Sequence, residues 1–174
     1  MSASSSSHHP PRSGIAGVVL GVGLGGFADG IALHQIARWH NMGSAVLRPD
    51  TMEAMKQNML WDGLFHAGTW LVTLAGVWLL WRDARRGAVR RARIFGGQML
   101  MGWAAFNLVE GLIDHHLLEL HHVRDLPEHV PLYDWVFLGV GGVLLGAIGW
   151  MMSRPPPPRK HRTRTRVEAE VPEG

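Results

Sequence analysis

The chain has 174 residues, the length of one domain, and its mean hydropathy is close to neutral. The absence of cysteine excludes disulfides, thiolate metal ligands and cysteine nucleophiles. The net charge is +3, and the sequence contains no glycine-rich phosphate loop, serine nucleophile elbow or kinase-type motif set.

Four apolar segments alternate with short charged ones, and the average hydropathy hides them. Each approaches the ~20 residues that a helix needs to cross a bilayer. The run 70–80 also lacks the regularly spaced polar positions of a soluble amphipathic helix. The sequence therefore predicts an all-α polytopic membrane protein, an antiparallel bundle of four transmembrane helices in one domain, 14–152. The predicted spans are about 14–37, 58–81, 94–118 and 134–152.

The polar ends of the chain are predicted to be disordered. In the N-terminal segment 1–13, His8 and His9 follow a serine run and are expected to have no function. The tail 153–174 carries four consecutive prolines, 155–158, and then a basic run. Basic runs beside a membrane commonly meet anionic lipid, and the lack of a stacking aromatic makes nucleic acid the weaker alternative.

The first span, 14–37, is predicted to stay in the protein rather than to be a cleaved signal peptide, because it runs into Asp29 instead of a processing site. Its glycine-rich run 21–26 resembles a nucleotide loop only superficially. Within an apolar helix such glycines favour close packing of a neighbouring helix.

The segment that follows, 38–57, and the start of the second span carry methionines at helical spacing. Thioethers bind Cu(I), so this face is a candidate copper-collecting patch. We favour the alternative, an amphipathic helix that lies on the membrane with its methionines in lipid. The methionines concerned are Met52, Met55 and Met59, with Met42 nearby.

Charge predicts the orientation. The connection 82–93 has six arginines against one acid, so it should face the cytoplasm, as should both termini. The connections 38–57 and 119–133 are mixed in charge and rich in histidine, and should face outward. Tryptophans agree with this layout: Trp39, Trp61 and Trp135 fall at predicted outer ends, and Trp81 and Trp150 at inner ends.

An acidic residue, a glycine and a histidine recur in three of the apolar segments. Although the spans alternate in direction, each copy falls in the outer half of its span, and Asp134 opens the fourth span at the same level. Ionisable groups at this depth are costly and usually functional. The copies are Asp29-Gly30…His34, Asp62-Gly63…His66 and Glu110-Gly111…His115.

The three copies differ in the spacing between their ionisable residues, and therefore in whether these residues share one face of a helix. Residues four apart share one helix face, as do Asp62 with His66 and Glu110 with Asp114. Asp29 and His34 are five apart, about 140° around a regular helix, and cannot both point at one ion. Either the helix deforms at Gly30, or one of the two only supports the ligands.

Imidazoles and carboxylates at one depth predict a transition-metal site of zinc, iron or copper near the outer face. An open coordination position would let the ion serve a hydrolase or an oxidoreductase. The alternatives are polar clamps between helices and, less favoured because of the carboxylates, haem. The predicted ligands are His34, Asp62, His66, Glu110, Asp114, and His115 or His116; Asp29, His121 and His122 are predicted to support them.

The three motifs, with His121-His122-Val123-Arg124 after the third, resemble an uncharacterised family of small bacterial predicted membrane proteins, a domain of unknown function. The resemblance covers about residues 14–152. It implies a four-span protein of the bacterial inner membrane and supplies no activity. Members are often encoded beside cytochrome oxidase assembly genes. This would suit a non-enzymatic alternative, a copper-handling or assembly factor with a respiratory membrane-protein partner.

Overall fold

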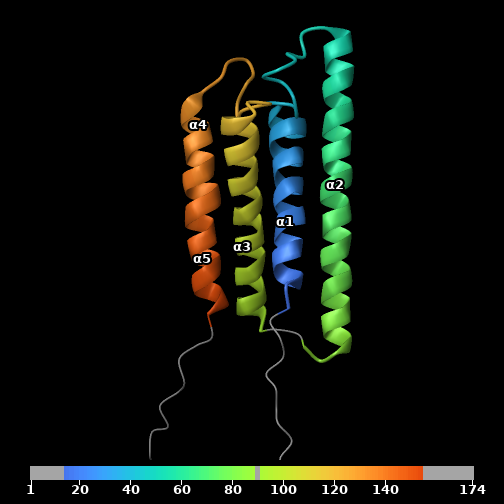
Figure 1. Cartoon of the computed structure of the whole chain (residues 1–174), viewed down its shortest axis with the longest axis vertical. Helices are drawn as coiled ribbons and strands as arrows, with labels where there is room; N and C mark the ends of the chain where they lie inside the picture. Colours follow the sequence, from blue (N-terminus) through green and yellow to red (C-terminus); the bar gives the residue numbers. More distant parts are fainter. Residues whose placement is uncertain (1–13, 89–90, 155–174) are drawn as a thin grey trace, which may run out of the picture.

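The computed structural model describes residues 14–88 and 91–154, and all regular structure in these ranges is helical. It forms four rods, and consecutive rods run in opposite directions (Figure 1). The rods are α1 (Ala16–Asp29) continued by the π-helix η1 (Gly30–Ala37); α2 (Met52–Arg85); α3 (Ala92–Glu110) continued by the π-helix η2 (Gly111–Leu117); and α4 (Pro131–Val136), the π-helix η3 (Phe137–Leu144) and α5 (Leu145–Ser153). The segments 1–13, with His8 and His9, and 155–174, with the basic run, lie outside the described residues.

Three rods are long and apolar enough to cross a membrane: Ala16–Ala37, Met52–Arg85 and Pro131–Ser153. The third rod, predicted as a span over 94–118, is helical from Ala92 to Leu117 but more polar. Its sequence carries Asn107, Glu110 and Asp114, and of these Glu110 belongs to the cluster described below.

The second rod is longer than predicted. Thr51 caps it, since its side chain accepts a hydrogen bond from the Ala54 backbone N–H at 3.2 Å. The helix then continues without a break for 34 residues, roughly 50 Å. The methionines from Met52 to Met59 therefore extend this rod and do not form a separate helix on the membrane surface.

The rods pack as a row, in the order α5, α3, α1, α2 (Figure 1). Glycines let neighbours approach closely in the middle of the row. A Cβ added at Gly97 would lie 2.6 Å from the Gly149 carbonyl oxygen, and one at Gly102 would overlap the backbone of Val18. The glycine-rich run 21–26 thus packs against α2 and α3, as predicted, and the central pair α1 and α3 forms the most enclosed part of the molecule.

Polarity is distributed inside out. The buried apolar side chains in the described ranges are few and mostly small, whereas buried acids, histidines and amides outnumber them. Large apolar side chains point outward along α2, where Trp70, Leu71 and Trp78 are each more than half exposed. A surface of this kind requires an apolar surround, which is what a bilayer supplies.

Two loops, 38–51 and 118–130, cover the end of the row at which η1 and η2 finish; we call this the loop end. The loops are joined by backbone hydrogen bonds from Ala45 N to Leu120 O (3.1 Å) and from Asp125 N to Trp39 O (2.9 Å). The Ser44 hydroxyl also donates to Asp125 at 2.6 Å. The two loops therefore form one layer across the ends of α1 and α3.

Candidate metal centre

A π-helix follows the acid in two of the three motifs. Hydrogen bonds in a π-helix join residues five apart, which places such residues one above the other. Asp29 and His34 are thereby brought together, with the carboxylate Oδ2 3.1 Å from the imidazole Nε2. Glu110 immediately precedes η2 and His115 lies within it; the two are also five apart and belong to one donor group. The sequence left two alternatives for Asp29 and His34, a deformed helix at Gly30 or a supporting role for one of them. The helix is deformed: a π-helix begins at Gly30.

The capping loops supply two further histidines. The Nδ1–H of His40 donates to the Val123 carbonyl at 2.9 Å, and that of His121 faces the Met42 carbonyl at 3.3 Å. A carbonyl only accepts, so in each neutral ring the Nε2 atom keeps its lone pair. These Nε2 atoms lie 3.8 Å from Asp29 Oδ2 and 3.7 Å from Glu110 Oε1, respectively.

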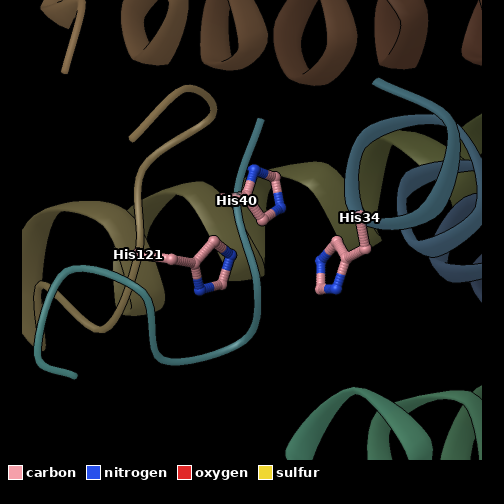
Figure 2. Close-up of side chains that lie close together, drawn as sticks. All are labelled: His34, His40 and His121. Atoms are coloured by element: carbon pink, nitrogen blue, oxygen red, sulfur yellow. The ribbon is translucent and has the colours of Figure 1, made fainter. Parts of the chain in front are cut away.

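Figure 2 shows His34 on its helix, with His40 and His121 coming from the two loops toward the same space. One ligand atom from each of these three histidines lies within 4.8 Å of the other two. Glu110, His115 and His121 form a second group whose ligand atoms meet the same limit. We call the six residues that share this space the buried cluster: Asp29, His34, His40, Glu110, His115 and His121.

The buried cluster is closed to solvent and leaves many polar atoms unpaired. Each member is at most 6% exposed. The atoms without a hydrogen-bond partner include Asp29 Oδ2, the Nε2 atoms of all four histidines and both carboxylate oxygens of Glu110. Burial, with His40 and His115 nearby, lowers the pKa of His121 well below its usual range, so its ring is neutral at pH 7.

Asp62 lies behind the buried cluster. Its Oδ1 is 3.0 Å from His34 Nδ1, on the opposite side of the ring from Asp29. It also accepts hydrogen bonds from the Asn41 side chain and the Met42 N–H, each at 2.7 Å. A carboxylate that holds the far nitrogen of a histidine fixes the ring's tautomer and orientation.

The other predicted site residues lie outside the buried cluster. His66 Nδ1 bonds to the carbonyl of Asp62 in its own helix. His116 is exposed, bonds to the Gly111 carbonyl and packs its ring against Trp135, so His115 is the member of this pair that faces inward. Asp114 is partly exposed and belongs to none of the described donor groups, and His122 belongs to a separate group with His129 and Asp134.

Sequence reasoning missed His40 and gave Asp29 and His121 only a supporting place. His40 and His121 lie in loops, where no helical period assigns a direction to a side chain. The available signal was the concentration of histidine in the two segments predicted to face outward.

A pocket of about 740 Å³ lies beside the buried cluster, between η1 and the start of α2. Its lining residues include His34, Asp62, Arg38, Met55, Met59 and His66.

The family comparison agrees with the inside-out fold. Neither the curated proteins nor the solved structures give a match to the chain. The family model described as "Predicted membrane protein (DUF2243)" matches residues 16–155, which include all four rods and both capping loops. The chain therefore belongs to this family of predicted membrane proteins, whose function is unknown.

Proposed function

We propose that the protein is a membrane metalloprotein that holds a transition-metal ion in the buried cluster. One observation carries the proposal: the unpaired Nε2 atoms of His34, His40 and His121 converge beside the unpaired oxygens of Asp29 and Glu110. Buried polar atoms are normally satisfied, and a cation among these atoms would satisfy them together.

The donor chemistry suits zinc first. Neutral imidazoles and carboxylates bind zinc, iron and copper, and three histidines with a carboxylate or water make a common zinc site. The cluster offers four imidazoles and two carboxylates, more than one four-coordinate ion uses. It can therefore accommodate one ion or an adjacent pair.

The rival is a set of polar clamps, with a protonated His34 bridging Asp29 and Asp62. With both ring nitrogens protonated, His34 would donate a hydrogen bond to Asp29, whose Oδ2 is 3.1 Å from Nε2, and one to Asp62, whose Oδ1 is 3.0 Å from Nδ1. This arrangement would leave both oxygens of Glu110 and the Nε2 atoms of His115 and His121 buried and unpaired. Each such group costs about 1–3 kcal/mol, so clamps alone explain the cluster less well than an ion.

We further propose that all four rods cross the bacterial inner membrane, with the loop end outside the cytoplasm. At the opposite end, arginines stack on exposed tryptophans: Arg154 lies 3.4 Å over Trp150, and Arg85 lies 5.2 Å over Trp81. Tryptophans favour a membrane interface, and the arginines favour the cytoplasmic one. α1 and α5 flank the polar third rod on two sides, and its Asn107 and Glu110 are buried and so kept from lipid.

The pocket beside His34 makes hydrolysis the reaction class to test. An ion with one open position would lower the pKa of bound water and present hydroxide to a substrate there. A copper-handling role is the second candidate, because Met55 and Met59 line this pocket and thioethers select Cu(I).

Elemental analysis of the full chain in detergent, purified without a histidine tag, tests metal binding. All samples carry His8→Ala and His9→Ala, to remove histidines outside the cluster. His34→Ala/His121→Ala should lose at least one equivalent of metal relative to the matched control His116→Ala. Far-UV circular dichroism and gel filtration check that the variants fold.

No metal in the unsubstituted protein, even after reconstitution with zinc, iron or copper, would leave the cluster as polar packing. Equal metal in the double variant and the control would place the ion elsewhere.

A further inference from the structure

A second donor group lies at the loop end, nearer to solvent than the buried cluster. It consists of His122, His129 and Asp134, each with one ligand atom within 4.8 Å of the others. Both histidines approach the same oxygen: Asp134 Oδ2 is 3.3 Å from His122 Nδ1 and 3.0 Å from His129 Nε2. The two rings stack with their centroids 3.8 Å apart, which holds both nitrogens on one side of the carboxylate.

Exposure rises outward through this group. The side chains of Asp134, His122 and His129 are 5%, 17% and 40% exposed. His122 Nδ1 is nevertheless buried and has no hydrogen-bond partner. An ion here would have buried donors on one side and open coordination positions toward solvent on the other.

Asp134 links this group to the buried cluster. Its second oxygen, Oδ1, accepts the Val123 N–H at 2.8 Å and lies 3.5 Å from His115 Nδ1. His115 in turn shares a donor set with Glu110 and His121. One carboxylate therefore contacts both the exposed histidines and the buried ones.

We propose that His122, His129 and Asp134 form a port site, which binds Zn²⁺ from the outer solution and passes it to the buried cluster through Asp134 and His115. This inference rests on the proposed function of the buried cluster. The transfer is an exchange of ligands, in which the ion leaves the two outer imidazoles for inner ones and no electron moves. Partial exposure gives the port site faster exchange than the closed cluster.

Zinc release from the full chain separates the two sites. The protein, in the His8→Ala/His9→Ala background, is stripped of metal, loaded with Zn²⁺ and mixed with excess chelator, and release is followed with time. We expect a fast phase from the port site and a slow phase from the cluster. His129→Ala should abolish the fast phase, keep the slow one, and make loading slower than in the unsubstituted protein.

Two further variants exclude a structural role for His129. His129→Asp keeps a zinc donor without the stacked ring, so it should restore a fast phase if the site binds metal. His122→Asn should behave as His129→Ala does. Glu128→Ala, at an exposed neighbour outside the group, is the matched control and should change neither phase.

A fast phase unchanged in both His129→Ala and His122→Asn would overturn the port site. Slow-phase zinc with no fast phase in the unsubstituted protein would also overturn it and leave the buried centre intact. No bound zinc at all would remove the port site, and with it zinc as the ion of the proposed function.

Discussion

Two regions carry the same acid–glycine–histidine motif and use it differently. In η1 the histidine follows the acid by five residues, a π-helix closes the spacing, and Asp29 and His34 meet at 3.1 Å. In α2 the spacing is four and the helix is regular, yet Asp62 and His66 do not form a site; His66 bonds to its own helix, and Asp62 reaches across to His34. One extra residue, accommodated by a π-helix, therefore distinguishes the pair Asp29 and His34, which both belong to the buried cluster, from Asp62, which only supports His34.

Removing that extra residue should have the largest effect. Deletion of Ala32, an exposed position in η1, restores the spacing of four found in α2. It should turn His34 away from Asp29 and abolish metal binding in elemental analysis. Ala32→Ser keeps the spacing and should retain the ion. Full metal content in the deletion variant would show that the π-helix is not needed.

The second largest effect is expected from replacing a loop histidine, compared with replacing a helix histidine. His40→Ala removes an unpaired Nε2 from the buried cluster, whereas His66→Ala removes a ring already bonded to the Asp62 carbonyl. We expect zinc affinity to fall by more than about 100-fold in the first variant and to stay nearly unchanged in the second. Competition with a zinc-binding dye measures both, and the reverse order would refute our assignment of the donors.

Asp62→Asn should have an intermediate effect. The amide can still accept from His34 Nδ1, but it lacks the charge that raises the basicity of the ring. Loss of a partner behind a zinc ligand typically weakens affinity about 10–100-fold. A loss as large as that of His40→Ala, in the same dye competition, would instead indicate that Asp62 binds the ion directly.

The motif glycines should show the smallest and most selective effects. A Cβ at Gly30 would lie 2.5 Å from His66 Nε2 and 3.1 Å from Phe65, whereas a Cβ at Gly63 meets nothing within 4 Å. Gly30→Ala should destabilise the protein by about 1–3 kcal/mol through overpacking. Gly63→Ala should stabilise it by about 0.5–1 kcal/mol through helix propensity. Thermal unfolding in detergent measures both, and equal shifts would contradict the packing described at Gly30.

Much of the fold follows from local sequence. Apolar runs mark the helices, and the ends at Ala37, Leu117 and Ser153 lie within a residue of the predicted ones. The row order α5, α3, α1, α2 depends on glycine contacts between distant segments, which no single helix encodes. The length of α2 depends on the Thr51 cap, a side-chain contact that hydropathy does not register.

The site divides in the same way. Asp29, His34, Glu110 and His115 carry a motif, so their sequence signals a shared role. The inward direction of Asp29 could not be read from a regular helix, since the π-helix changes the phase by about a quarter turn or more over five residues. His40 and His121 acquire their positions from hydrogen bonds to Val123 and Met42, each in the opposite loop.

The spread of the cluster along the chain has a consequence for biosynthesis. The donors run from Asp29 to His121, and Asp134 of the port site comes still later. A nascent chain that has inserted only its first two rods offers Asp29, His34 and His40, without the partners from the third rod and the second loop. On the proposed topology, the centre can therefore assemble only after the third rod has crossed the membrane, and metal loading would serve as a late checkpoint in maturation.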